Sequence, residues 1–382
     1  MNLVAGAGIS GLSFSHFFGK NCTNLDCGQG RIKTFSDKPP IDMGAQFFSK
    51  KDLSIYRLIK DLNMQSEIKQ TNFNKLFLEK NGLFIEINST KEELLNKDAQ
   101  NINLFKNKLK KIDNFLINNF EELQHKPFYE WYSEEYGGES IWIIDGILKS
   151  ITFSNSKELN SLYGLIACQS FFTKTFTVKN GLEQVLKKLR QDKTIVKSKL
   201  EYIELQNKSF KVKFENNNPI PCKKLASAIP SNYLSQIISD KELAKYLSKI
   251  PYSGCKVILI KTQDNLTNNF PGLITPERKY ISAILKNKSY YTILAPYKSF
   301  CTTDEQIFDE LNLNTTKELI LSTNWDYGLP TCTTKLHLIQ EKINEITDQY
   351  DNFAICGDFM GLPSLDACVE SAKKAAEKLN KN

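Results

Sequence analysis

A glycine-rich turn at the start of the chain constrains the fold more than any other feature of this sequence. The run Met1–Ala5 is apolar and of strand length. Glycines Gly6, Gly8 and Gly11 follow it with G-x-G-x-x-G spacing, and a helix-compatible apolar stretch, Leu12–Phe18, comes next. In such a turn the first glycine allows a sharp reversal, the second lets the backbone approach a pyrophosphate, and the third lets helix and strand pack closely. The helix N-terminus then holds the phosphates. The context predicts a dinucleotide site; an ordinary tight strand-to-helix turn is the alternative.

The length of 382 residues suffices for two domains, or for one discontinuous domain with a large insertion. Hydrophobic residues make up 41% and charged residues 24% of the chain, values typical of a soluble globular protein. The most apolar candidate for a membrane span, residues 141–153, is interrupted by Asp145 and Lys149. No basic and then apolar leader is recognisable, so we expect a cytoplasmic protein.

The net charge of +7 comes from 50 basic and 43 acidic residues that are interspersed along the chain. Lysine pairs such as Lys110-Lys111 and Lys373-Lys374 are typical of solvated helix faces. We therefore expect no nucleic-acid partner, and peripheral contact with an anionic membrane surface stays open.

The cysteines and histidines favour neither a metal site nor a protein-based nucleophile. Nine cysteines are scattered without a CxxC pair, and an odd number without a leader indicates reduced thiols. His16, His125 and His337 lie far apart in sequence, so no zinc site and no Ser-His-Asp arrangement is indicated. This pattern assigns the chemistry to a bound cofactor.

The hydrophobic pattern changes near residue 180. Residues 51–125 are expected to be mainly helical, with Leu53, Tyr56, Leu58 and Ile59 on a helical period and a hairpin at Asn81-Gly82. The remaining expected elements are helices at 103–123, 128–172, 181–189 and 365–379, and strands at 195–196, 200–205, 209–214, 225–230 and 353–358. Residues 254–261 and 278–296 are expected to be rich in strands.

A series of further motifs follows the glycine turn. These are Gln29-Gly30-Arg31-Ile32, Asp42 to Phe47 (D-x-G-A-Q-F), Lys179-Asn180-Gly181-Leu182, Ala228-Ile229-Pro230, Trp325 to Pro330 (WDYGLP), Cys356-Gly357-Asp358 and Ser364 to Ser371 (SLDACVES). Together and in this order, they resemble the flavin-containing amine oxidoreductase family, which includes monoamine and polyamine oxidases, protoporphyrinogen oxidase and phytoene desaturases. The resemblance covers nearly the whole chain.

This resemblance implies an α/β fold with two domains. A discontinuous, Rossmann-like FAD-binding domain is expected from residues 1–48, 175–235 and 345–382. A substrate domain with a mixed sheet and a helical insert is expected from residues 49–174 and 236–344.

The resemblance also implies the residues that hold FAD. The segment from Gly11 to Asp26 is shorter than is usual in the family, and Asp26 is the best candidate to bind the adenosine ribose. Cys332 lies in the broad region where some relatives attach FAD covalently, but its surroundings differ, so we expect non-covalent binding. The predicted cofactor-binding residues are Gly6, Gly8, Ile9, Ser10, Gly11, Asp26, Gly30, Arg31, Gly44, Ala45, Gln46, Leu200, Gly357, Asp358 and Leu365.

Lys256 is the candidate catalytic residue, because several amine-oxidising members have a lysine at this position, bonded through water to flavin N5. A solvated strand face is the alternative for this lysine. Trp325 and Tyr327 resemble the aromatic residues that line the family's substrate cavity, and plain core packing is their alternative.

The implied activity is that of an FAD-dependent oxidoreductase. It removes a hydride from a C–N or C–C bond of a small molecule to flavin N5, and O2 or another acceptor reoxidises the flavin. The amine-oxidase-like interpretation leads because of Lys256. A protoporphyrinogen-oxidase- or desaturase-like enzyme is the first alternative, and a flavin-binding protein without turnover is the second. The substrate and the oligomeric state stay open.

Overall fold

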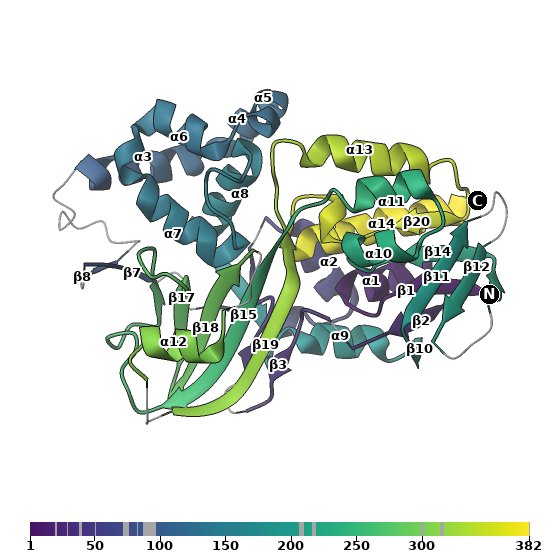
Figure 1. The fold of residues 1–382 in the computed structure, drawn as a ribbon, viewed down its shortest axis with the longest axis horizontal. Helices are drawn as coiled ribbons and strands as arrows, with labels where there is room; N and C mark the ends of the chain where they lie inside the picture. Colours follow the sequence, from purple (N-terminus) through teal and green to yellow (C-terminus); the bar gives the residue numbers. More distant parts are fainter. Residues whose placement is uncertain are drawn as a thin grey trace. The chain divides into compact units, whose positions relative to one another are not determined.

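The computed structural model (Figure 1) divides into two compact units, each assembled from separate stretches of the chain. It describes residues 1–19, 21–28, 30–37, 40–49, 51–71, 76–81, 83–86, 97–205, 210–215, 219–298, 302–313 and 317–381. The first unit comprises Met1–Lys69, Thr177–Pro251 and Leu336–Asn382, and the second comprises Gln70–Phe176 and Tyr252–Lys335. The predicted α/β class with a discontinuous first domain is confirmed.

The boundaries of the units differ from those of the predicted domains. Residues 49–69, 236–251 and 336–344 were expected in the substrate domain and lie in the first unit, whereas residues 175 and 176 were expected in the FAD-binding domain and lie in the second. Assigning FAD to the first unit and substrate to the second remains a prediction.

A five-stranded parallel sheet forms the centre of the first unit, with strand order β10-β2-β1-β14-β20. Strands β1, β14 and β20 are short runs that are mostly buried, as is typical of parallel sheets, whereas β10 at one edge of the sheet is mostly exposed. In β1, Leu3, Val4 and Ala5 are all at most 1% exposed. The chain passes from β1 to β2 on one side and later adds β14 and β20 on the other. The strand order therefore reverses between β1 and β14, the place where open α/β sheets bind ligands. The strands are β1 (Asn2–Ala5), β2 (Thr23–Asp26), β10 (Thr194–Lys197), β14 (Lys224–Ser227) and β20 (Phe353–Ile355).

Helices α1 (Ile9–Phe18) and α14 (Leu365–Lys381) pack together against this sheet, as Figure 1 shows. Small side chains at Ala372, Ala375 and Ala376 let α14 approach the sheet closely. The predicted closing helix and buried strand at the end of the chain are thus confirmed.

Helix α2 (Leu53–Asp61) forms where a helical period was predicted, but a different face is buried. Ile55, Leu58 and Ile59 are at most 1% exposed, whereas Leu53 and Tyr56 are 54% and 43% exposed. Positions 55, 58 and 59 follow the i, i+3, i+4 spacing of one helix face, and position 56 does not. Only Leu58 and Ile59 of the four predicted residues therefore contribute to the core.

The first unit contains further helices and short strands, and β11, β12 and β13 form a separate antiparallel sheet. Strands β6 and β9 lie at the unit boundaries. The bounds are β3 (Thr34–Phe35), β4 (Ile41–Asp42), β5 (Phe48–Ser49), the 3₁₀ helix η1 (Gln65–Glu67), β6 (Ile68–Gln70), β9 (Thr175–Val178), α9 (Glu183–Arg190), β11 (Leu200–Leu205), β12 (Phe210–Phe214), β13 (Ile220–Cys222), α10 (Ser231–Ile237), α11 (Lys241–Leu247), α13 (Leu336–Thr347) and the 3₁₀ helix η4 (Asp358–Met360).

The second unit contains a seven-stranded mixed sheet with order β19-β15-β18-β17-β16-β7-β8. Only β16 and β7 pair in parallel among these neighbours. Helix α12 (Asp304–Glu310) covers one face, where Ile307 and Phe308 join a core with Ile258, Ile260 and other residues of the sheet. The strands are β7 (Phe77–Lys80), β8 (Leu83–Glu86), β15 (Tyr252–Thr262), β16 (Gly272–Ile274), β17 (Ala283–Asn287), β18 (Tyr290–Tyr297) and β19 (Lys317–Pro330).

The predicted helical insert and hairpin of this unit are confirmed. Strands β7 and β8 pair antiparallel, while Gly82 of the predicted turn lies outside the described residues. The helices are α3 (Lys97–Leu109), α4 (Ile112–Asn118), α5 (Phe120–His125), α6 (Phe128–Tyr136), the 3₁₀ helix η3 (Gly138–Ser140), α7 (Ile141–Thr152) and α8 (Ser161–Phe172). Within the described ranges, none of the helices has both the length and the apolar character needed to cross a bilayer.

Candidate functional site

The glycine turn lies between β1 and α1, and each glycine has its own structural requirement. Gly6 has a φ of +116°, and its N–H donates to the carbonyl of Leu25 at 3.0 Å. A Cβ at Gly11 would overlap the Gly6 carbonyl oxygen, so Gly11 permits close packing of the helix on the turn. A Cβ at Gly8 would meet nothing within 4 Å. The space beside Gly8 is therefore open, as a phosphate cradle requires.

The N-terminus of α1 is suited to an anion. Gly8 is the N-cap residue and has no capping side chain, and the first turn carries no acidic residue. The first N–H groups of a helix have no intrahelical partner, and the helix dipole places partial positive charge there. Ile9 and Ser10, which begin α1, are 8% and 7% exposed. The turn therefore fits the pyrophosphate of a dinucleotide.

Asn24, which the sequence analysis did not select, holds this turn in shape. It lies in the middle of β2 and is 0% exposed. Its Nδ2 donates to the carbonyls of Gly6 at 3.1 Å and Gly11 at 3.2 Å, and its Oδ1 accepts from Ser15 Oγ at 2.8 Å. Buried polar groups need such partners, so the amide fixes the two ends of the turn relative to β2. A polar residue inside a buried strand was the available signal.

Asp26, the predicted ribose ligand, ends β2 beside the same turn. Its Oδ1 accepts from the N–H of Gly28 at 2.9 Å, and its Oδ2 accepts from Arg190 Nη2 at 2.9 Å. The same Nη2 donates to the Ala7 carbonyl at 3.1 Å. Arg190 is the last residue of α9, and its side chain is 41% exposed against 17% for Asp26. Sequence analysis missed Arg190, which follows in the chain long after the turn.

The second glycine motif is joined to the end of β20 by an ion pair. Arg31 Nη1 lies 2.6 Å from Asp358 Oδ2, and the Asp358 side chain is 5% exposed. The N–H of Ala45 donates to the Arg31 carbonyl at 3.3 Å, which places the Gly44–Gln46 segment next to this motif. A Cβ at Gly30 would meet nothing within 4 Å, and Gln29 of the motif lies outside the described residues.

Asp42 joins the D-x-G-A-Q-F motif to the Asn180-Gly181-Leu182 turn. Its Oδ1 accepts from Thr34 Oγ1 at 2.6 Å and from the Leu182 N–H at 3.0 Å, and its Oδ2 accepts from Thr177 Oγ1 at 3.2 Å. Burial raises the pKa of Asp42, and these hydrogen bonds lower it in part. Gly181 has a φ of +89°, and a Cβ there would lie 2.8 Å from Asp42 Oδ1. Asp42 therefore connects these two motifs through hydrogen bonds, and we call this connection the Asp42 joint.

The turn that carries Gly357 and Asp358 is held from two helices. The N–H of Gly357 donates to Ser371 Oγ of α14 at 3.0 Å. Gln340 of α13 donates through Nε2 to the carbonyls of Phe359 at 2.8 Å and Gly361 at 3.0 Å. Neither anchor was predicted from the sequence, and both fix the backbone that precedes α14.

The remaining predicted cofactor residues in the first unit are Leu365 and Leu200. Leu365 begins α14 directly after this turn and is half-buried. Leu200 begins β11 in the separate antiparallel sheet and is 8% exposed.

Lys256, the predicted catalytic residue, is buried in the second unit. It is 7% exposed, and its Nζ lies 2.5 Å from Asp304 Oδ1 in the first turn of α12. Ser322 Oγ of β19 donates to the same carboxylate oxygen at 2.9 Å. The solvated-face alternative is therefore wrong, and the ammonium is paired on the sheet face that α12 covers.

Trp325, a predicted substrate residue, lies on the opposite face of this sheet. In the β15–β19 pair, Lys256 is opposite Asn324, and Cys255 is opposite Trp325. Residues opposite one another share a face, and neighbours along a strand alternate, so Lys256 and Trp325 point to different faces. The half-buried Tyr327 packs edge-on against Tyr252 with ring centroids 5.4 Å apart.

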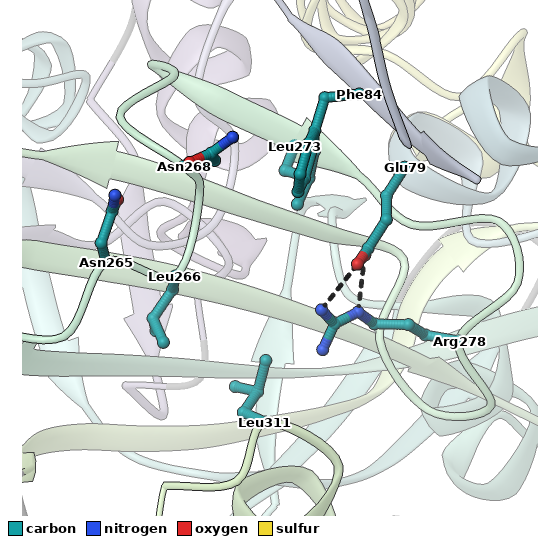
Figure 2. A pocket seen from close by; sticks show the side chains of 8 residues that line it. All are labelled: Glu79, Phe84, Asn265, Leu266, Asn268, Leu273, Arg278 and Leu311. Carbon is teal, nitrogen blue, oxygen red and sulfur yellow. Dashed lines mark hydrogen bonds and ion pairs between the residues drawn. The ribbon is translucent and has the colours of Figure 1, made fainter. Parts of the chain in front are cut away.

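A separate pocket of about 310 Å³ opens in the second unit (Figure 2). In its wall the Arg278 guanidinium makes two bonds to the Glu79 carboxylate, Nε to Oε2 at 2.8 Å and Nη2 to Oε1 at 3.1 Å. The two charges satisfy each other, and none of the predicted site residues lines the pocket. The lining residues are Glu79, Phe84, Asn265, Leu266, Asn268, Leu273, Arg278 and Leu311.

A family model shows the family of this chain, and solved structures show its fold. The sequence model of the family described as "Flavin containing amine oxidoreductase" matches residues 30–328. No curated protein sequence matches the chain.

Solved structures with the same fold come from several bacteria. A putative protoporphyrinogen oxidase from Exiguobacterium sp. 255-15 has 16% identity and a TM-score of 0.78, covering 99% of this chain and 98% of the other. A CLA-producing fatty acid isomerase from P. acnes has 12% identity and a TM-score of 0.79, with coverage of 98% of this chain and 97% of the other. Cyclohexylamine oxidase from Brevibacterium oxydans IH-35A has 12% identity and a TM-score of 0.73, with coverage of 99% and 98%.

The likeness to these structures shows the fold alone, because the identities are low. The family match spans most of the chain, and it includes the Arg31 motif, the Asp42 joint and Lys256. The chain therefore belongs to the flavin-containing amine oxidoreductase family and is a flavin-dependent oxidoreductase.

Proposed function

We propose that the first unit binds FAD non-covalently and that the protein oxidises a small molecule at a C–N or C–C bond. The observation that carries the proposal is the uncapped N-terminus of α1 beside the open space at Gly8. It lies at the carboxyl edge of the parallel sheet, at the reversal of strand order where such sheets bind nucleotides.

Different residues at this edge would bind different parts of the cofactor. The N–H groups of the glycine turn and α1 would bind the pyrophosphate, and Asp26 would accept a hydrogen bond from the adenosine ribose. Asp358, held by Arg31, would meet the ribityl–pyrophosphate portion, as its family counterpart implies. Bound flavin supplies the chemistry by accepting a hydride at N5 and passing the electrons to O2 or another acceptor.

Two substrate classes follow from different observations. The match of Lys256 to a lysine of amine-oxidising relatives favours an amine substrate. The ion pair of Lys256 with Asp304 favours the second class, a porphyrinogen or polyene oxidised at a C–C bond, because the ammonium already has a partner within its own unit. An electron acceptor is needed in either case.

FAD binding is tested first, with paired glycine variants. The Gly8 backbone has a φ of −78° and a ψ of −171°, an extended conformation that valine readily adopts, and no atom of the chain would meet its Cβ. Gly8→Val should therefore fold normally and purify without flavin absorption near ~450 nm. Gly11→Val should destabilise the turn itself, because its Cβ would overlap the Gly6 carbonyl. A folded Gly8→Val protein with full flavin occupancy would contradict the phosphate cradle.

The substrate class is tested by anaerobic flavin reduction with a panel of an amine, a porphyrinogen and a polyene. Bleaching by the amine alone supports the amine-oxidase-like enzyme, and bleaching by the porphyrinogen or polyene supports the second class. FAD that is bound but reduced by none of them supports the flavin-binding protein without turnover.

A further inference from the structure

We propose that Arg190 is a positioning residue for the adenosine end of the cofactor site, acting through Asp26. The inference rests on the proposed function. One nitrogen, Arg190 Nη2, donates both to Asp26 Oδ2 at 2.9 Å and to the Ala7 carbonyl at 3.1 Å. A single guanidinium therefore ties the predicted ribose acceptor to the phosphate-binding turn.

The guanidinium of Arg190 bonds the Asp26 oxygen opposite the one that Gly28 bonds. The carboxylate ends β2 at the start of a short loop, and the Gly28 N–H of that loop donates to Oδ1. Arg190 occupies the other oxygen, so both oxygens are oriented before a ribose arrives. A carboxylate has about four acceptor positions, so one that accepts a single bond on each oxygen can still accept from a ribose hydroxyl. Binding to a prearranged carboxylate avoids the entropy cost of ordering it.

The fold supplies the anchor from a distant segment. Arg190 ends α9, and α9 follows the Asn180-Gly181-Leu182 turn that Asp42 holds. The guanidinium is planar and offers several N–H donors in a fixed arrangement, so it reaches a carboxylate and a carbonyl together. With side-chain exposures of 41% and 17%, the Arg190–Asp26 ion pair itself adds little to folding stability. The effect of losing Arg190 should therefore appear in cofactor affinity and not in the stability of the apoprotein.

A double-mutant cycle on the full-length apoprotein tests the inference, with FAD affinity measured by calorimetric titration. Arg190→Gln should weaken FAD binding about 10-fold and Asp26→Ala by about 10- to 100-fold, the range for charge-assisted hydrogen bonds. The double variant should bind no more weakly than Asp26→Ala alone, because Arg190 acts through that carboxylate. Additive losses would overturn the inference and point to direct contact between Arg190 and the cofactor.

Three controls separate positioning from bulk charge and from folding. Lys187→Gln removes the same charge from an exposed position on α9 and should leave the affinity unchanged. Arg190→Lys should restore part of the affinity, because an ammonium keeps the charge and loses the planar arrangement. ADP, which has the adenosine end without flavin, should show the same loss as FAD. An equal effect of Lys187→Gln, or unchanged ADP binding in Arg190→Gln, contradicts the proposal.

The outcomes also separate this inference from the proposed function. Wild-type protein that binds FAD while Arg190→Gln binds it equally well overturns the positioning role alone. Wild-type protein that binds no FAD overturns the proposed function and the inference with it.

Discussion

The buried ion pair between Lys256 and Asp304 allows a direct test of whether Lys256 serves the fold or the chemistry. Lys256→Met keeps most of the side-chain stem and leaves Asp304 without its cation. Removing one partner of a buried pair costs about 3–5 kcal/mol. Here Asp304 keeps the Ser322 hydroxyl, is 21% exposed and lies at a helix N-terminus that favours a carboxylate. We therefore expect a loss of about 2–3 kcal/mol.

Asp304→Asn should cost more than Lys256→Met. It leaves an ammonium whose side chain is only 9% exposed without a carboxylate, so the full ~3–5 kcal/mol applies. The double variant should cost less than the sum of the single variants by about 1–3 kcal/mol. Urea denaturation supplies the free energies of unfolding. Lys261→Met, the same substitution at an exposed position of β15, is the matched control and should stay within about 0.5 kcal/mol of wild type.

Stopped-flow absorbance on the same variants separates the two roles. If the pair is structural, the rates of both flavin half-reactions in folded Lys256→Met should fall by much less than the ~100-fold expected when a positioned acid–base group is lost. Wild-type stability in Lys256→Met together with a ~100-fold slower half-reaction would refute the structural argument and restore the amine-oxidase-like assignment.

Three further variants test the packing and the pH dependence of the molecule. The pKa of Asp42 is raised above 3.8 by burial, so its contribution to stability is present at low pH and is lost as the pH rises through the folded value. Asp42→Asn should thus gain stability relative to wild type between acid and neutral pH in urea titrations, and a constant difference would contradict this. Burial lowers the pKa of Lys106 from 10.5 to about 8, so wild-type stability should rise between these pH values. Lys106→Met should be more stable than wild type at pH 7 by about 1–2 kcal/mol. This is less than the whole pKa shift implies, because solvent still reaches the amine. Urea denaturation above pH 10.5 should show no difference in stability between the two proteins. Gly181→Ala should lower the thermal midpoint by an amount equivalent to at least ~1–3 kcal/mol, because φ is +89° and the Cβ would meet Asp42, whereas Gly138→Ala should be nearly neutral.

The features that the sequence predicted well are those fixed by local backbone chemistry. The strand, glycine turn and helix at Gly6 to Gly11 depend on residues within one short segment, and so does the β7–β8 hairpin. Burial was harder to predict, since Leu53 and Tyr56 of α2 have the right chemistry but lie on its exposed side. The face that a helix buries depends on what it meets, and the helical period alone does not say where that partner lies.

The residues that the sequence did not reveal act across long separations in the chain. Asn24 bonds the turn from a neighbouring strand, and Arg190 reaches Asp26 from the end of α9. These partners carry no motif of their own, because any chain that brings a donor to the right place satisfies the same acceptor. A motif can therefore predict that a carboxylate binds a ribose without predicting what orients that carboxylate.

The sequence also could not predict the direction of the Lys256 side chain. Its position in the sequence matches a catalytic lysine, yet the residue type and the strand leave the direction of the side chain undetermined. A shift of one residue in register exchanges the two faces of a strand. The pairing of Lys256 with Asn324 and of Cys255 with Trp325 places the lysine on the face that α12 covers and the tryptophan on the other. If both residues acted on one substrate, it would have to be reached from both sides of the same sheet. For this reason the face on which Lys256 lies is stronger evidence about its role than its match to the family pattern.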